Sequence, residues 1–225
     1  MIWGLCLLAC ASAHALDLGK LHKQADATER HEALTEWARP RALSLSFSDQ
    51  VSLASALMPL IHNGSPDDQI LGAYAQENIL RALRETGTEP HLIWRGQVHW
   101  TAKDHPNAEV RATALRALGY LRVGKIHRRE FLLLEQSLES PVLLLRLSAA
   151  LGLFEGYDYP PRAIESLMEE IHHPTPGLPA ETRQRILESL SRARAKLGWF
   201  WSWLYMGRQN LRALDEGCAS TLLSP

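Results

Sequence analysis

Histidine and cysteine are the residue types from which this chain would most readily build a catalytic or metal site. It has ten His and three Cys in 225 residues. The one adjacent His pair, His172-His173, stands beside Pro174, and no HExxH, CxxC or other cluster with zinc-ligand spacing occurs. Cys218 is the only Cys beyond the first ten residues, and no His lies near it in sequence. The spacing therefore predicts no metal site, no cofactor and no cysteine nucleophile.

One group of residues could form a catalytic site. His99 and His105 flank a predicted turn that also holds Asp104, so the three side chains could meet. No GxGxxG, GxxxxGK[ST] or GxSxG motif supports nucleotide binding or a hydrolase nucleophile. We therefore predict a non-enzymatic protein. The alternative is an enzyme, or an enzyme accessory factor, with a site in a groove around these three residues.

Composition predicts a folded protein without a general attraction to polyanions. Apolar residues make up 46% and charged residues 22% of the chain, and the formal net charge is −1. Nucleic acid is therefore not an expected partner. A basic cluster is the local exception, and we select it as a candidate partner-binding site for an acidic protein, a glycan or a lipid headgroup. A solvated helix start explains it equally well. It consists of Arg122, Lys125, His127, Arg128 and Arg129.

An internal repeat predicts the architecture. The stretches His105–Gly119 and Ser140–Gly152 both open with a polar residue and Pro, continue with an apolar-Arg pair, and then place Ala and Leu at helical spacing; they start 35 positions apart. A weaker copy begins at Ser65 and a degenerate one includes Thr182-Arg183. Pro suits the first turn of a helix, and Ser65 and Ser140 can cap free N–H groups.

Each copy of the repeat has a second helical segment before it. These segments are 50–61, 91–101, 126–138 and 161–171, with Gly residues at the joints. Two helices in each 35–40 residues are typical of a helical solenoid. The sequence therefore predicts an all-α fold, an α-solenoid of about four helical pairs.

The motif from Pro106 to Leu118 resembles HEAT repeats, and especially the short bacterial HEAT-like repeats of the phycobilisome-lyase type. This resemblance implies an architecture but not a function. It also implies a structural role for Arg111 and Arg146, which in such repeats help to join neighbours. Iron-binding proteins of this class carry several His-Glu pairs, whereas this chain has one, His31-Glu32. Nothing in the sequence indicates bilin attachment.

The first fifteen residues resemble an export signal. Residues 2–15 contain no Asp, Glu, Lys or Arg, and Ala13-His14-Ala15 suits cleavage before Leu16. Leu7-Leu8-Ala9-Cys10 matches a bacterial lipobox, which would make Cys10 a lipidation site. An ordinary hydrophobic first helix is the third interpretation. No basic residue precedes the apolar run, so we expect the natural start to lie upstream. We predict a periplasmic or envelope-associated protein.

Near the C-terminus an aromatic segment follows a basic run. It includes Trp199, Trp201 and Trp203, and its apolar groups would point in every direction from a helix. We expect this segment to cap the end of the solenoid. A partner-binding patch and a membrane contact are the alternatives.

The predicted division is a signal at 1–15, a helical lead-in at 16–45, repeats at 46–197, and an aromatic cap and tail at 198–225. The expected function is a scaffold or adaptor that binds a protein partner through the solenoid surface. A membrane-peripheral lipoprotein is a further alternative.

Overall fold

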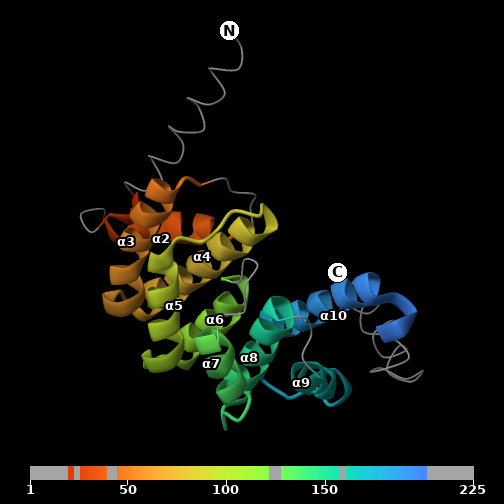
Figure 1. The fold of residues 1–225 in the computed structure, drawn as a ribbon. Coiled ribbons are helices and arrows are strands. Elements are labelled where there is room, and N and C mark those ends of the chain that lie inside the picture. The colour runs from red at the N-terminus through yellow and green to blue at the C-terminus, as the bar shows by residue number, and fades with distance from the viewer. Residues whose placement is uncertain (1–19, 23–25, 40–44, 122–127, 158–160, 202–225) are drawn as a thin grey trace, which may run out of the picture. The chain divides into compact units, whose positions relative to one another are not determined.

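A computed structural model of the protein describes residues 20–22, 26–39, 45–121, 128–157 and 161–201 (Figure 1). For residues 181 and 193–201 the description covers the backbone. These ranges contain helices and no strand, which confirms the predicted all-α class for the described part of the chain. The eight helices of the repeat are present, and a further helix lies in the predicted lead-in. None of the helices in these ranges is long and apolar enough to cross a membrane.

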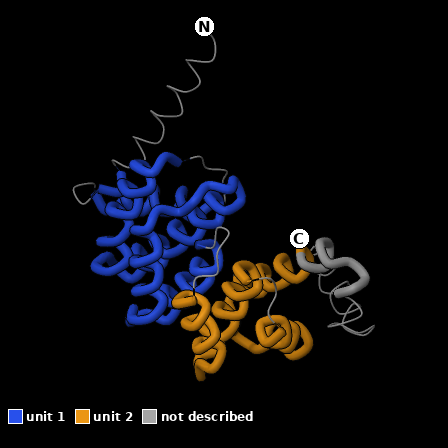
Figure 2. Tube along the Cα trace, in the orientation of Figure 1, with its two compact units in different colours: residues 1–124 blue, residues 125–225 orange. Residues whose placement is uncertain are grey.

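The chain divides into two compact units, Met1–Gly124 and Lys125–Pro225 (Figure 2). Unit 1 contains the lead-in helix and the first two helical pairs, and unit 2 contains the other two pairs. The division falls within the predicted basic cluster, where Lys125 follows Gly124.

Unit 1 has five helices within its described residues: α2 (Ala27–Trp37), α3 (Phe47–Asn63), α4 (Pro66–Glu85), α5 (Leu92–Asp104) and α6 (Ala108–Tyr120). The two predicted pairs are α3 with α4 and α5 with α6, and the partners in each pair pack together. The pairs also pack on each other, α4 against α6 and α3 against α5, while α2 lies against α4. The largest fully buried side chains include Trp37, Leu57, Ile79, Leu83, Trp94 and Leu115.

The helix starts of unit 1 follow the predicted signals in part. Ser65 accepts a hydrogen bond from the Asp68 N–H (3.2 Å), and Pro66 begins α4. In the next pair the motif is shifted, because Asn107 is the N-cap of α6 and Pro106 stands before the helix. After α4 the chain turns at Gly87, whose φ of +70° is a left-handed conformation that side chains disfavour.

Long polar side chains tie α3 to α5. Gln50 on α3 uses both its amide atoms on the backbone just before α5. Gln97 on α5 donates to the Ala54 carbonyl (3.1 Å), and His105 at the end of α5 bonds the Ile61 carbonyl (2.9 Å). Later residues of α3 bond later residues of α5, so the two helices run parallel, one repeat apart.

A buried ion pair ties α4 to α6 in the same way. Arg116 on α6 donates to the carboxylate of Glu77 on α4, with a shortest distance of 2.9 Å, and the guanidinium lies 5.7 Å from the centre of the Tyr74 ring. One turn further along, Arg84 donates to the Gly119 carbonyl (2.7 Å). The partners are 35 and 39 positions apart, which matches the spacing of the sequence repeat.

Unit 2 has four helices within its described residues: α7 (Arg128–Ser137), α8 (Leu143–Gly156), α9 (Pro161–His172) and α10 (Ala180–Trp201). Here α8 packs against α7, α9 and α10. Between α8 and α10, Ser189 donates to Glu155 (2.6 Å), and Arg192 bonds the same carboxylate. These partners are 34 and 37 positions apart, so α8 and α10 repeat the spacing between α4 and α6.

The two motif arginines make the same contact. Arg111 donates to the His105 carbonyl (2.9 Å) and Arg146 to the Ser140 carbonyl (3.1 Å), in each case six positions back. These bonds close the turn inside one helical pair, and not the junction between neighbouring pairs that the resemblance implied. Ser140 does not cap α8 directly: it accepts from the N–H of Val142, and Val142 is an N-cap without a side-chain hydrogen bond.

Candidate functional site

The predicted basic cluster lies only partly in the described residues. Arg122 and Lys125 fall outside them, whereas Arg128 and Arg129 are exposed in the first turn of α7. A helix N-terminus carries a partial positive charge, so two arginines there oppose it and do not help the helix to form.

The aromatic and lipidation candidates lie beyond the described side chains. Trp199 and Trp201 belong to the last turns of α10, where the description covers only the backbone. Trp203 and Cys10 lie outside the described residues, as does the whole predicted signal. The capping, binding and lipidation predictions for these residues stay predictions.

The three residues that the sequence selected around the α5–α6 turn differ in exposure and in their hydrogen-bond partners. His105 is buried, its Nδ1 accepts from the Asn107 N–H (3.1 Å), and its Nε2 meets the Ile61 carbonyl (2.9 Å). Because Nδ1 accepts, the proton stands on Nε2 and donates to that carbonyl. Asp104 is exposed while His99 is buried. In the described residues no group of three His, Cys, Asp or Glu side chains is placed to hold a metal.

His62 lies next to this turn and sequence reasoning did not select it. Its ring meets Trp100 edge-on, with 4.2 Å between centroids, and lies 5.8 Å from the His105 ring. Neither of its ring nitrogens has a hydrogen-bond partner among the residues that the structure describes. Burial lowers the pKa of His62 below the ordinary value of 6.5, and the nearby His105 lowers it further. The edge-on contact of this imidazole holds Trp100 at the end of the two helices.

Four large apolar side chains on α3 and α5 are exposed, and we call the surface that they mark the α3–α5 face. Phe47 and Leu92 stand at the starts of the two helices, and Met58 and Trp100 lie further along them. The rings of Phe47 and His91 meet edge-on at 5.9 Å, which places Phe47 beside the start of α5, where Leu92 follows His91. Met58 and His62 share one side of α3, and the ring contact of His62 places Trp100 beside them. The face thus has two apolar clusters.

On α3 charge is absent between these clusters, whereas α5 carries the partly exposed Arg95 between Leu92 and Trp100 and the exposed Lys103 after Trp100. From Gln50 to Asn63, α3 contains no Asp, Glu, Lys or Arg. Its exposed positions there include Ser52 and Ser55, and the neighbouring helix exposes Gly96, where an added Cβ would meet nothing within 4 Å. The clusters are eleven residues apart on α3, which at 1.5 Å per residue is about 16 Å. The result is a stretch of α3 without charge that has an apolar cluster at each end, while the facing stretch of α5 carries Arg95.

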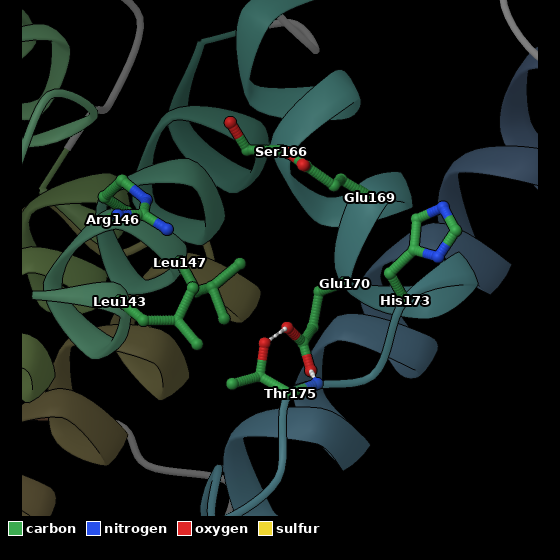
Figure 3. A pocket seen from close by; sticks show the side chains of 8 residues that line it. All are labelled: Leu143, Arg146, Leu147, Ser166, Glu169, Glu170, His173 and Thr175. Atoms are coloured by element: carbon green, nitrogen blue, oxygen red, sulfur yellow. Dashed lines mark hydrogen bonds between the residues drawn. The ribbon is translucent and has the colours of Figure 1, made fainter.

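Unit 2 holds a pocket of about 280 Å³ between α8, α9 and the loop that leads to α10 (Figure 3). Two facing stripes line it. On α8 the stripe is at helical spacing and consists of Leu143, Arg146 and Leu147. On α9 the stripe is equally regular and passes into the loop; it consists of Ser166, Glu169, Glu170, His173 and Thr175. The start of α8 faces the end of α9, so the two helices run antiparallel.

The two acids of the pocket differ in their roles. Glu170 is buried, and its carboxylate accepts from the Thr175 N–H (2.9 Å) and the Thr175 hydroxyl (2.8 Å), as Figure 3 shows. Arg183 lies 3.8 Å from the same carboxylate and donates to the Thr175 carbonyl. Glu170 therefore fixes the loop that closes one side of the pocket. Glu169 is exposed at the rim and takes no part in this network.

Sequence reasoning missed both the α3–α5 face and the pocket. The signal for the face was the long uncharged run of α3, which also fits a buried helix. The signal for the pocket was the spacing of Ser166, Glu169, Glu170 and His173 on one side of a helix. That spacing alone does not identify the surface opposite, which comes from α8.

Comparison with known proteins adds no relative: no protein-family model matches the chain, and no curated protein matches it. The HEAT-like family therefore remains a prediction from the repeat.

Proposed function

We propose that the protein is a non-enzymatic scaffold or adaptor of HEAT-like helical pairs, which binds a partner protein through the α3–α5 face. The observation that carries the proposal is the exposure of Phe47, Met58, Leu92 and Trp100 on two neighbouring helices, of which α3 has no charged residue from Gln50 to Asn63. Trp100 is 44% and Leu92 is 72% exposed. Exposed apolar side chains are ordinary when scattered, but a contiguous group marks an interaction site.

The occupant that fits this face is an amphipathic helix of the partner. Two apolar clusters about 16 Å apart match residues eleven positions apart on a helix, which is about three turns. Ser52, Ser55 and Gly96 keep the strip between the clusters low, so a helix backbone can approach it closely. Because α3 has no acid or base in this stretch, the part of the partner that packs on α3 should be apolar, since an unpaired charge buried there would be costly.

The solenoid is a part of the proposal. The polar bonds between α4 and α6 and between α8 and α10 join residues 34 to 39 positions apart, which supports one repeating arrangement in each unit. The aromatic segment around Trp199, Trp201 and Trp203 is then the cap of the last pair, as terminal repeats require. Export to the bacterial envelope belongs to the proposal too, and its support is the signal-like first fifteen residues.

The non-enzymatic part rests on how the suspected catalytic residues are used. Backbone groups occupy both ring nitrogens of His105, so neither nitrogen is left for a substrate. The alternative function, an enzyme with a site around His99, Asp104 and His105, would need a ring nitrogen of His105 to be available.

A site-specific crosslinking experiment tests the proposal. A photoreactive amino acid is placed at Ser48 or at Ser55, exposed positions two turns apart on α3 that leave the four apolar side chains intact. A matched control carries it at Asp67, which is exposed on α4. The crosslinked peptides are identified by mass spectrometry after irradiation in an envelope extract.

The expected result is a single partner segment that is apolar on one side. The crosslinks from Ser48 and from Ser55 should fall about seven residues apart on this segment. Trp100→Ala should abolish both crosslinks, and Asp67 should give neither. Crosslinks that scatter over many proteins, or that the Asp67 control reproduces, would show that the α3–α5 face is not a specific binding site.

A further inference from the structure

The pocket of unit 2 has no part in the proposed function, which uses unit 1 alone. It is lined by two apolar side chains, Leu143 and Leu147, and by groups of opposite charge on opposite walls (Figure 3). At about 280 Å³ it stands at the lower end of the range of small-molecule sites, which begins at about 300 Å³. A ligand of amino-acid size fits this volume, whereas a dinucleotide does not.

Arg146 supplies the cation of the α8 wall. One guanidinium nitrogen donates to the Ser140 carbonyl (3.1 Å), and this is the only polar contact of the side chain within the described residues. An arginine presents five N–H donors in a rigid fork that suits a carboxylate. The contact with Ser140 thus holds the fork in place while leaving donors for a ligand.

Glu169 supplies the anion of the α9 wall. Glu170 beside it is fully engaged in fixing Thr175, and it has the Arg183 guanidinium within 4 Å. Glu169 has no ion pair or hydrogen bond to its carboxylate among the residues described, so this group is open to a ligand. In Figure 3, Arg146 and Glu169 lie on different sides of the pocket, with Leu147 between them.

We propose that this pocket binds a small zwitterion with an apolar side chain, of the class of α-amino acids. The ligand's carboxylate pairs with Arg146, its ammonium group pairs with Glu169, and its side chain packs on Leu143 and Leu147. With this ligand Arg146 and Glu169 each have a partner of opposite charge, whereas a simple acid would pair only with Arg146 and a simple amine only with Glu169.

Three probes of one carbon skeleton test this proposal. L-leucine carries both charges, 4-methylpentanoate lacks the ammonium group, and isopentylamine lacks the carboxylate. Each is titrated up to about 10 mM into the ¹⁵N-labelled full chain, and amide shifts are followed by NMR. The expected result is saturable binding of L-leucine with shifts in α8 and α9, and binding at least about tenfold weaker for each single-charge probe.

Two variants connect the binding to the named residues. Arg146→Met should weaken L-leucine binding by at least about tenfold, and Arg111→Met, which removes the equivalent turn bond in unit 1, should leave it unchanged. Glu169→Gln alters an exposed side chain, so it keeps the fold even if Arg146→Met does not, and it should weaken L-leucine but not 4-methylpentanoate.

Three outcomes would overturn the proposal. The first is that L-leucine binding does not saturate, and the second is that its shifts map away from α8 and α9. The third is that 4-methylpentanoate binds as tightly as L-leucine. Unchanged L-leucine binding in both Glu169→Gln and a folded Arg146→Met would overturn it as well.

Discussion

Replacing Arg116 by Met should destabilise unit 1 strongly, because it leaves Glu77 buried without its cation. Glu77 is 0% and Arg116 4% exposed, and the guanidinium donates to both carboxylate oxygens at 2.9 to 3.2 Å. Breaking a buried pair by removing one partner costs about 3–5 kcal/mol. That is a large share of the roughly 5–15 kcal/mol that stabilise a domain.

The double variant Glu77→Leu/Arg116→Met should recover most of this loss. It removes both charges from the interior, and buried pairs replaced by apolar side chains are often close to neutral. Its cost should therefore stay below about 2 kcal/mol, and the cycle should give a coupling of several kcal/mol.

The assay is urea unfolding followed through the amide signals of α4 and α6, which report on unit 1. The exposed pair Arg81–Glu85, with atoms 3.7 Å apart and side chains 18% and 63% exposed, provides the control. Arg81→Met should cost no more than about 0.5 kcal/mol. If Arg116→Met costs as little as Arg81→Met, or if the double variant costs the sum of the single ones, the buried pair does not have the role derived for it.

Two further predictions concern stability. Because the pKa of His62 is lowered in the folded state, the unfolded chain binds the extra proton first, so the contribution of His62 to stability should fall as the pH drops below 6.5. His62→Phe should flatten that part of the curve of unfolding free energy against pH, and identical curves would contradict the assignment. Gly87→Ala should cost about 1 kcal/mol because its φ is +70°. Gly96→Ala, in an open position inside α5, should instead stabilise by about 0.5–1 kcal/mol, and thermal unfolding that gives both the same sign would refute this reading.

The helices were predictable because their signals are local. Apolar spacing, the Pro residues and the cap at Ser65 placed the helices of all four pairs to within a few residues. The shift of the α6 start to Asn107 was not predicted, since His105 carries the same polar-Pro signal as Ser65. In the structure the His105 ring instead forms a hydrogen bond with the Ile61 carbonyl, 44 positions away in sequence.

The candidate sites were less predictable because each depends on two segments distant in sequence. The apolar residues of α3 looked like core residues, and only the packing of α3 against α4 and α5 shows which of them stay exposed. The repeat implied that Arg146 joins neighbouring pairs, whereas its bond to the Ser140 carbonyl lies within one pair. The sequence could not predict that Arg146 also lines a pocket, because Glu169 on the opposite wall comes from α9, which packs antiparallel to α8.

The most direct test of the central claim is the affinity of the partner segment for two single variants. Trp100 on the α3–α5 face and Leu132 on α7 have almost equal exposed fractions, 44% and 45%. With the crosslinked segment as a labelled peptide, Trp100→Ala should weaken binding by about 2 kcal/mol or more, which is roughly thirtyfold, because Trp is among the residues that most often act as interface hot spots. Leu132→Ala should leave the affinity unchanged. Equal effects of the two variants, or no effect of Trp100→Ala, would contradict the assignment of the α3–α5 face as the binding surface.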